Sequence, residues 1–182
     1  YIKGILDEKK MNGSVLNIPV IGNDNSIDQL LADNYFFITV GQIKSAEVRK
    51  RLFFHLKNRN AKIATVVSPS AAVSKYVNIG EGTIIHHQAV VNAGAKIGSN
   101  CIINTNAVIE HDAQIGNQTH ISTGCLINGD VIVGDECFVG SGAVISNGVR
   151  ITDKVIIGAG SLLIKDIKEP GTYAGSPLKR IS

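Results

Sequence analysis

Glu110, His111 and Asp112 stand side by side in the run AVIEHD, which otherwise consists of small and branched residues. An imidazole titrates near neutral pH, so His111 could take a proton from an attacking amine or hydroxyl group. A carboxylate beside it, from Asp112 or Glu110, could orient the ring and stabilise its protonated form. A histidine at a protein surface is by default only solvated, so a general base at His111 is one of two interpretations.

A strict six-residue period surrounds this triplet and determines where its side chains point. Every sixth residue from Val73 to Leu163 is aliphatic, and the residue two places before each of them is small. A helix would repeat about every 3.6 residues and a plain strand about every two, so this period indicates very short strands separated by corners. His111 comes two places after the aliphatic Ile109, on the outward part of its repeat. The pattern predicts a β-solenoid that carries His111 on its surface.

Three repeats would close one triangular coil, so residues eighteen apart should stack about 4.8 Å from each other. Gly or Asn often follows the aliphatic residue, which indicates corners with unusual backbone dihedral angles. The small slot also holds Cys101, Cys125 and Cys137, where a free thiol packs as a modest hydrophobe. Cys101 and Cys137 would lie two coils apart, which is beyond disulfide reach.

Residues 1–67 lack the six-residue period and show a different pattern of apolar and polar residues. We expect strands at 1–7, 35–41 and 62–67 and helices at 26–33 and 45–60, capped by Ser26 and Ser45. This alternation predicts a small Rossmann-like α/β domain at 1–67, followed by the coils at 68–167 and a tail at 168–182.

The longer of the two helices should be amphipathic. Its apolar face would consist of Val48, Leu52, Phe53 and Leu56. The rest of its surface would be covered by Arg49, Lys50, Lys57 and Arg59. We take these basic residues as a solvated face rather than a binding patch.

The six-residue pattern resembles the hexapeptide-repeat family of acyltransferases over roughly residues 68–182. The resemblance implies a mainly β fold built on a left-handed parallel β-helix. The left hand comes from the resemblance alone, because connections between parallel strands are otherwise almost always right-handed. The resemblance further implies a homotrimer formed through the faces of the coils, and a C-terminal stretch, EPGTYAGSPLKRIS, that covers the last coil.

The α/β region before the coils resembles more narrowly the sugar acetyltransferases related to sialic acid O-acetyltransferase and to bacterial nucleotide-amino-sugar N-acetyltransferases. In that group a glycine-rich turn after the first strand receives the nucleotide. No such turn occurs here, and the stretches ILDEKK and FITVGQ resemble later parts of that domain, so its front looks missing. By position Asp7, Glu8 and Gly41 match residues near the nucleotide, although Asp7 and Glu8 could equally be plain turn residues.

The same resemblance assigns roles around the triplet. NTNAVIEHD and IGNQTHISTG are similar to a motif in which a His before an acidic residue is the general base, which implies His111 as the base and Asp112 as its partner. Asp112 stands where some relatives have Glu. His120 and Asn104 match residues beside the acetyl group, and Gly129 matches a glycine whose amide meets the thioester carbonyl. Without the family, His120 would be taken as a surface residue and the other two as corner residues.

Ser141, Ala159 and Lys165 match the groove that holds coenzyme A between two subunits, with Lys165 placed for a phosphate. Ordinary coil residues and a solubilising charge are the alternatives. His86 and His87 receive no role. Zinc is the main alternative for the histidines, because the γ-class carbonic anhydrases, another hexapeptide-repeat branch, bind it with three His across a subunit interface. The HxxxxH spacing of that branch is absent between the histidines of the site, so we expect no metal.

We therefore expect an acetyl-CoA-dependent N-acetyltransferase that acts on a nucleotide-linked amino sugar in bacterial surface-glycan biosynthesis. The alternatives are an O-acetyltransferase of sialic acid or a related sugar, a non-catalytic solenoid, and a zinc hydratase. The net charge of +3 is too small to indicate a nucleic-acid polymer, and no run of Lys and Arg indicates a membrane. Neither a signal peptide nor a membrane span is recognisable, so we expect a cytoplasmic location.

Overall fold

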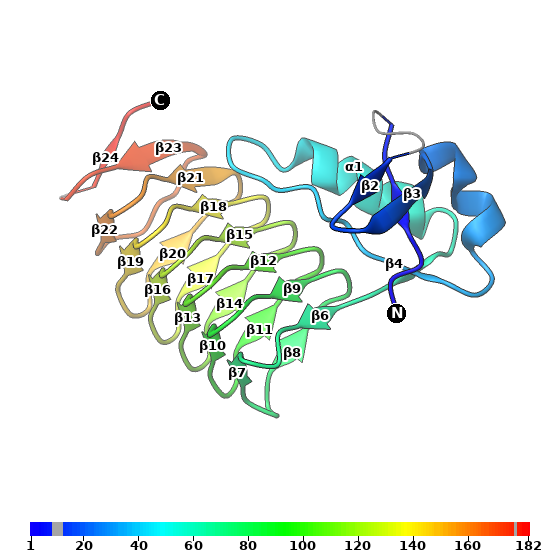
Figure 1. The fold of residues 1–182 in the computed structure, drawn as a ribbon. Coiled ribbons are helices and arrows are strands. Elements are labelled where there is room, and N and C mark those ends of the chain that lie inside the picture. Colours follow the sequence, from blue (N-terminus) through cyan, green and yellow to red (C-terminus); the bar gives the residue numbers. More distant parts are fainter. Residues whose placement is uncertain (9–12, 177) are drawn as a thin grey trace.

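The computed structural model describes residues 1–8, 13–176 and 178–182. Residues 9–12 and 177, which include the two lysines of the ILDEKK stretch and one position of the C-terminal tail, lie outside the described residues. Very short strands between residues 66 and 163 wind into a three-sided prism, and the N-terminal region lies beside it (Figure 1). The predicted parallel β-helix is therefore present.

Three parallel sheets form the sides of the prism, and we number them in the order in which the chain visits them. Face 1 consists of β6 (Val66–Val67), β9 (Ile84–Ile85), β12 (Ile102–Ile103), β15 (His120–Ile121), β18 (Phe138–Val139) and β21 (Val155–Ile157). Face 2 consists of β7 (Ala72–Val73), β10 (Val90–Val91), β13 (Val108–Ile109), β16 (Leu126–Ile127), β19 (Val144–Ile145) and β22 (Leu162–Leu163). Face 3 consists of β8 (Asn78–Ile79), β11 (Lys96–Ile97), β14 (Gln114–Ile115), β17 (Ile132–Val133) and β20 (Arg150–Ile151).

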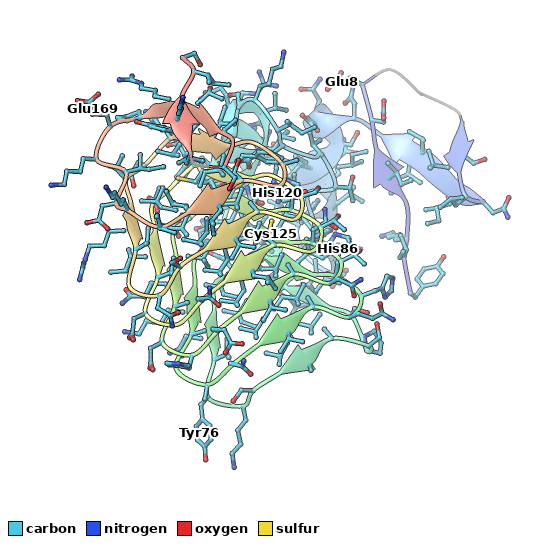
Figure 2. The ribbon with its side chains drawn as sticks, turned by 90° about the vertical axis from the view of Figure 1, so that its left-hand side faces the viewer. Glu8, Tyr76, His86, His120, Cys125 and Glu169 are labelled. Carbon is cyan, nitrogen blue, oxygen red and sulfur yellow. The ribbon has the colours of Figure 1, made fainter. Side chains whose placement is uncertain are left out.

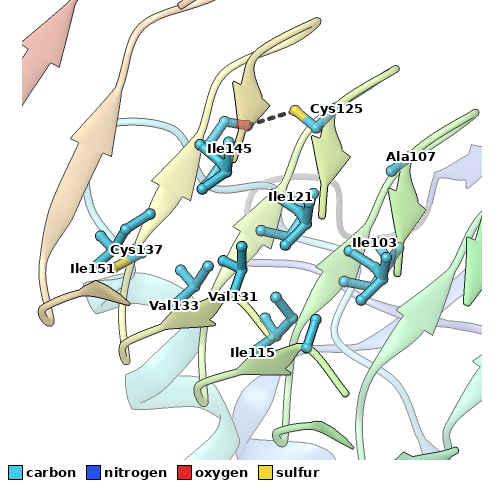
Figure 3. Close-up of a cluster of buried hydrophobic side chains, with 14 of the residues drawn as sticks. Ile103, Ala107, Ile115, Ile121, Cys125, Val131, Val133, Cys137, Ile145 and Ile151 are labelled. Carbon is cyan, nitrogen blue, oxygen red and sulfur yellow. Dashed lines mark hydrogen bonds between the residues drawn. The ribbon is translucent and has the colours of Figure 1, made fainter. Parts of the chain in front are cut away.

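Within each face, a strand pairs with the strand eighteen residues later. Val90 faces Val108 on face 2, and Ile109 faces Ile127 in the next coil. The aliphatic residue of each repeat points inward, so Ile103 and Ile121 meet inside the prism (Figure 3). One continuous column of buried side chains therefore fills the bore, as the six-residue period predicts.

The cysteines belong to this column. Cys101, Cys125 and Cys137 are free and fully buried, as predicted. Figure 3 shows Cys125 and Cys137 among the buried side chains. The Cys101 thiol donates to the Gly116 carbonyl oxygen at 3.0 Å, and the Cys125 thiol donates to the Gly140 carbonyl oxygen at the same distance. Burial raises the pKa of the Cys101 and Cys137 thiols to about 12. These thiols remain protonated at neutral pH and serve packing rather than nucleophilic chemistry.

The glycine that follows the aliphatic residue serves close packing between coils, and our expectation of unusual dihedral angles at this position is wrong. Gly98 and Gly116 have no left-handed φ; the left-handed residues come two places later, at Asn100 and Gln118. A Cβ on Gly98 would lie only 2.7 Å from the backbone nitrogen of Asn117 in the next coil. A side chain is excluded there because the two backbones approach too closely.

The strands of the N-terminal region are shorter than predicted. β1 (Ile5–Leu6) pairs in parallel with β3 (Ile18–Gly22), and β4 (Tyr35–Phe36) pairs in parallel with β5 (Lys62–Ile63). The expected strand at 35–41 is thus limited to its first two residues. The expected strand at 62–67 divides between two sheets, because its last two residues form β6 on face 1.

A hairpin that the sequence did not indicate joins β2 (Ser14–Val15) to β3 in antiparallel pairing. Both turn residues, Leu16 and Asn17, have left-handed φ angles of 50° and 63°. Two consecutive left-handed residues are typical of the two-residue hairpin turn whose twist matches that of the strands. Leucine is uncommon in this conformation, which explains why the turn is not recognisable from residue type.

The helices begin differently from the prediction. The first is a 3₁₀ helix, η1 (Asp24–Leu30), and its N-cap is Asn23, whose side chain accepts a hydrogen bond from the Asn25 amide at 3.1 Å. Ser26 is therefore not the cap; it lies inside the first turn. The second is α1 (Glu47–Lys57), where the Ser45 hydroxyl accepts from the Glu47 amide at 3.1 Å although Ala46 occupies the N-cap position.

The basic side of α1 docks the N-terminal region onto the prism, so the expectation of a solvated basic face is wrong. The Arg49 side chain is only 2% exposed. One of its terminal nitrogens donates to the carbonyl oxygens of Ile38 at 3.0 Å and Val40 at 2.6 Å. The other donates to the Asn100 side-chain oxygen at 2.7 Å, across to the prism. Arg49 thus joins two parts of the chain that the sequence analysis treated separately.

Two further lysines of α1 support this docking. Lys50 pairs with Glu136 at 2.6 Å, and Lys57 pairs with Glu81 at 2.5 Å. Both glutamates lie at the corners between face 3 and face 1, as Asn100 does. The apolar side of α1 covers a small second core formed by Ile27, Ile38, Phe53, Leu56, Ala61 and Ile63. Val48, which we expected on that apolar side, is exposed.

The C-terminal tail extends face 1. β23 (Gly171–Ala174) pairs in parallel with β21, and β24 (Lys179–Arg180) pairs with β23 in antiparallel fashion. Tyr173 and Leu178 pack against the end of the bore. Across the described ranges, the structure has no helix of the length and apolar character needed to cross a bilayer.

Candidate active site

His111 and Asp112 form a hydrogen-bonded pair at a corner between face 2 and face 3. Asp112 Oδ2 lies 3.0 Å from His111 Nδ1. Because an ionised carboxylate only accepts, Nδ1 carries the proton and Nε2 keeps its lone pair. The His111 side chain is 58% exposed, so Nε2 can meet a substrate directly. This arrangement could serve as an oriented general base.

The structure decides between the two neighbouring carboxylates. Glu110 accepts a hydrogen bond at 2.7 Å from the side-chain amide of Asn92, one coil earlier. Asp112 therefore orients the ring, and its hydrogen bond is the largest cause of the raised pKa of His111. Desolvation is the second-largest cause and lowers this pKa, and the negative charges of Asp112, Asp130 and Glu110 each raise it by a smaller amount.

Gly129 lies directly above the base, one coil further along the chain. A Cβ at this position would lie 2.7 Å from His111 Nε2, closer than packed atoms allow. The backbone of Gly129 is not left-handed, so only the space above Nε2 requires a glycine. Among the described residues the Gly129 amide has no hydrogen-bond acceptor, and its carbonyl accepts from Gly148 at 2.9 Å. The Gly129 N–H is therefore available to a ligand.

Asn147 is a residue of this corner that the sequence analysis missed. Its side-chain nitrogen would lie 3.3 Å from a Cβ on Gly129. The eighteen-residue step could have found it, because His111, Gly129, Asn147 and Lys165 are spaced by eighteen and stack along one edge. We call this the base edge.

His120 and Asn104 form a second pair, at the edge between face 1 and face 2. His120 Nδ1 lies 2.7 Å from the Gln42 carbonyl oxygen and must donate to it. Asn104 donates its side-chain amide to His120 Nε2 at 3.2 Å. Burial lowers the pKa of His120. His120 is only 8% exposed, so the alternative of a surface residue is wrong.

Gln42 is a further residue that the sequence did not indicate. It follows Gly41 in the loop between β4 and α1, and its side chain donates to the Cys137 carbonyl oxygen at 3.2 Å. Gly41 itself is exposed, with open space around its α-carbon. Asp7 and Glu8 follow β1; the Asp7 amide donates to the Gly22 carbonyl oxygen at 3.0 Å, and Glu8 is exposed (Figure 2).

Ser141 and Ala159 lie on the same edge as Asn104, toward the C-terminal end. The Ser141 hydroxyl lies 2.9 Å from that of Ser122, which is one coil above Asn104. The Gly160 amide donates to the Ser141 carbonyl oxygen at 2.9 Å, which stacks the corner of Ala159 on that of Ser141. We call the edge that carries Asn104, His120, Ser141 and Ala159 the acetyl edge, after the role that the family resemblance implies for it.

Lys165 lies at the top of the base edge, beside the C-terminal tail. It lines an open cavity of about 540 Å³ together with Leu162, Lys168, Tyr173 and Arg180. Arg180 is paired with Glu169 at 2.7 Å. The lining is otherwise mostly apolar and also includes the carboxylates of Asp166 and Glu169, so Lys165 and Lys168 are the cations that could meet a phosphorylated ligand.

The two edges do not meet within one chain. Asn104 and Glu110 are six residues apart across face 2, so a strand rise of about 3.3 Å per residue separates the edges by roughly 15–20 Å. The structure therefore brings His111, Asp112 and Gly129 together, and it brings Asn104 and His120 together elsewhere. In the part of the chain that the structure describes, no group of three His, Cys, Asp or Glu side chains could hold a metal ion.

Two family models match the coils. The one described as "Bacterial transferase hexapeptide (six repeats)" matches residues 76–111, 94–129 and 112–147. The one described as "Hexapeptide repeat of succinyl-transferase" matches residues 130–165. A search of curated proteins found no match.

Solved structures match nearly the whole chain. The acetyltransferase domain of PglB from Neisseria gonorrhoeae is 31% identical, with a TM-score of 0.90 over 98% of this chain and 86% of that chain. PerB from Caulobacter crescentus, in complex with CoA and GDP-perosamine, is 30% identical, with a TM-score of 0.91 over 98% and 84%. WeeI from Acinetobacter baumannii, at 23% identity and a TM-score of 0.83, shares the fold.

The repeats and the exposed His–Asp pair on a loop-free coil define a hexapeptide-repeat transferase with a left-handed β-helix, which confirms the expected hand. The similarity to the gonococcal and Caulobacter enzymes extends over both the coils and the N-terminal region. The chain belongs to the hexapeptide-repeat sugar acetyltransferases.

Removing the charge of Asp112 should move the pH dependence of acetyl transfer toward acid. Asp112→Asn keeps a side chain that tolerates the left-handed φ of 60° but loses the carboxylate that raises the pKa of His111. The base then deprotonates at lower pH, so the acidic limb of the kcat/KM profile moves to lower pH. The plateau value of kcat/KM should fall about tenfold or more. A pH profile of both proteins measures this. A limb that stays in place or moves to higher pH would contradict the role of Asp112.

Filling the space above the base should abolish most activity without unfolding the protein. In Gly129→Ala the new methyl group displaces the exposed His111 ring, so we expect kcat to fall about a hundredfold. The free energy of unfolding should change by less than about 0.5 kcal/mol, because the ring can move into solvent. Steady-state kinetics and urea unfolding of the same preparation separate the two effects. Full activity in this variant would show that Nε2 needs no open space.

Proposed function

We propose that the protein is an acetyl-CoA-dependent N-acetyltransferase that acts on a nucleotide-linked amino sugar in bacterial surface-glycan biosynthesis. The observation that carries the proposal is the exposed His111 Nε2, oriented through Asp112 and left open by Gly129. The related PerB structure contains CoA and GDP-perosamine, and a mutant of the same protein is described as a perosamine N-acetyltransferase. The gonococcal domain has been solved with acetyl coenzyme A.

The chemistry is a direct transfer. The amino nitrogen of the sugar attacks the thioester carbonyl carbon, and His111 Nε2 takes a proton from that nitrogen. The Gly129 amide donates to the oxyanion of the tetrahedral intermediate. Collapse of the intermediate breaks the carbon–sulfur bond, and the imidazolium returns the proton to the CoA thiolate. The products are the N-acetylated sugar and free CoA, without an acyl-enzyme.

The acetyl edge supplies the remaining contacts. Asn104 and neutral His120 would hold the acetyl group, and Ser141 and Ala159 would flank the pantetheine arm of coenzyme A. Lys165 and its cavity would receive a phosphate of the same molecule, through a charge-assisted hydrogen bond.

We assign nucleotide binding to residues 1–67, the coils at 68–167 to acetyl transfer, and the tail at 168–182 to the end of the prism. Asp7, Glu8 and Gly41 are the proposed nucleotide-binding residues. Gly41 precedes Gln42, whose carbonyl holds His120, so a nucleotide at Gly41 would lie beside the acetyl edge. A cytoplasmic location agrees with the supply of acetyl-CoA and nucleotide sugars.

A homotrimer would unite the two edges. The outward residues of face 2 are all aliphatic, namely Ala72, Val90, Val108, Leu126, Val144 and Leu162. Those of face 3 are mostly polar, and α1 covers the corner between face 3 and face 1. Face 1 also carries mostly apolar outward residues, but Ile102 and His120 there are buried, whereas Leu126 and Leu162 on face 2 are exposed. Face 2 is thus the apolar side that we assign to contacts with other copies of the chain, and it is bounded by the base edge and the acetyl edge. Packing three chains around it would place the base edge of one beside the acetyl edge of the next.

Release of the CoA thiol from acetyl-CoA tests the function. We expect turnover with a nucleotide-linked 4-amino-4,6-dideoxy sugar and a loss of about 10²–10⁴-fold in His111→Ala. Sialic acid in a parallel reaction tests the O-acetyl alternative. Turnover with sialic acid alone would replace our proposal by O-acetyl transfer, and silence with both acceptors would remove it.

Complementation between two inactive variants tests the shared site. His111→Ala and Asn104→Ala should each be inactive as purified homotrimers. After co-expression in equal amounts, about one quarter of all sites, which is one site in each mixed trimer, would combine an intact base edge with an intact acetyl edge. Activity should therefore return in the mixture. Failure to recover activity in verified mixed trimers would place the whole site within one chain.

A further inference from the structure

His86 is an unpartnered imidazole on the acetyl edge, one coil below Asn104. Its amide donates to the Ile103 carbonyl oxygen at 2.8 Å, which fixes its backbone beneath that of Asn104. Its side chain is half-buried, and within the described residues neither ring nitrogen has a hydrogen-bond partner. Figure 2 shows His86 and His120 on the same side of the prism. His120 uses both of its ring nitrogens, whereas those of His86 remain available.

The neighbouring His87 is held in place by two serines. Its Nδ1 lies 2.7 Å from the Ser68 hydroxyl and 3.3 Å from the Ser70 hydroxyl. Ser68 is buried and comes eighteen residues before His86, so it extends the same edge by one more coil. The edge therefore carries a cluster of hydroxyl and imidazole groups on the N-terminal side of Asn104.

This cluster is suited to neutral polar groups. Burial, and then the proximity of His87, lower the pKa of His86, so its ring is neutral at neutral pH. A neutral imidazole offers one donor and one acceptor, which matches a sugar hydroxyl better than a phosphate. A cationic pair would be required to hold a diphosphate by charge.

We propose that His86 and His87, with Ser68 and Ser70, form the subsite for the sugar ring of the acceptor, and that His86 binds one of its hydroxyl groups. The inference rests on the proposed function. Coenzyme A would extend from Asn104 toward Ser141 and Ala159, which leaves the opposite direction along the edge for the acceptor. One coil spacing of about 4.8 Å is close to the width of a pyranose ring, so an amine beside Asn104 places the far side of the ring at His86.

Steady-state kinetics with each substrate varied in turn test the subsite. In His86→Ala we expect the KM of the amino-sugar acceptor to rise about tenfold, the value for one lost hydrogen bond of about 1.4 kcal/mol. The KM of acetyl-CoA and the temperature of unfolding should not change. His86→Gln keeps a donor and an acceptor and should recover part of the affinity. Lys96→Ala, an exposed change on face 3 away from both edges, serves as the matched control.

A deoxygenated acceptor identifies the interaction itself. The wild-type enzyme should bind acceptors that lack one ring hydroxyl less well than the parent sugar, and for one such analogue His86→Ala should no longer discriminate. An unchanged acceptor KM in His86→Ala, or a rise of both KM values with a lower unfolding temperature, would overturn the subsite. Both outcomes can be measured only if the wild-type enzyme acetylates the amino sugar. If the proposed function fails, the wild type itself is inactive, so the two failures are distinguishable.

Discussion

The backbone ladder between residues eighteen apart is the constraint on which the rest of the structure depends. It places every inward aliphatic residue above another one, so that the core is a continuous column along the prism rather than a compact central cluster. The same ladder stacks the surface, and residues that are remote in the sequence become neighbours at a fixed spacing. His111 and Gly129 are such a pair: the glycine is above the base because one full coil separates them. The candidate site is therefore a consequence of the period that builds the core.

Arg49 couples the N-terminal region to this frame. Its guanidinium donates to the carbonyl oxygens of Ile38 and Val40, which fixes the loop that continues to Gln42. The Gln42 carbonyl in turn holds the His120 ring. Burying a charge is costly unless it is hydrogen-bonded, and both terminal nitrogens of Arg49 find acceptors on the two sides of the interface, whereas its Nε has no partner among the described residues. The contacts that dock the N-terminal region onto the prism thus also orient the His120 ring on the acetyl edge.

The sequence was most informative where the period applies. The strands, the buried cysteines and the neighbouring His111 and Asp112 follow from spacing alone, because local order on a coil is also spatial order. The N-terminal region has no such period. Three of its features depend on packing between distant segments: the burial of Arg49, the turn at Leu16 and the contact from Gln42. For two of them the residue type points the other way, because arginine is usually exposed and leucine is uncommon in a left-handed turn. The roles proposed for the acetyl edge came from the family resemblance. The sequence around His120 does not indicate whether its side chain is buried or solvated.

No loop is inserted between the coils, so the space around His111 and Asp112 comes from glycines in the neighbouring coils. The base stands between two glycines: Gly129 leaves Nε2 open, and Gly94, one coil below Asp112, leaves room for the carboxylate, which a Cβ there would displace. Because the carboxylate can lie back against the previous coil, the shorter aspartate still reaches Nδ1 at 3.0 Å. The substitution of Asp for the Glu of some relatives thus keeps the orienting hydrogen bond. It also links residue 112 to residue 94, since a larger residue at Gly94 would push the carboxylate away from the ring that it orients.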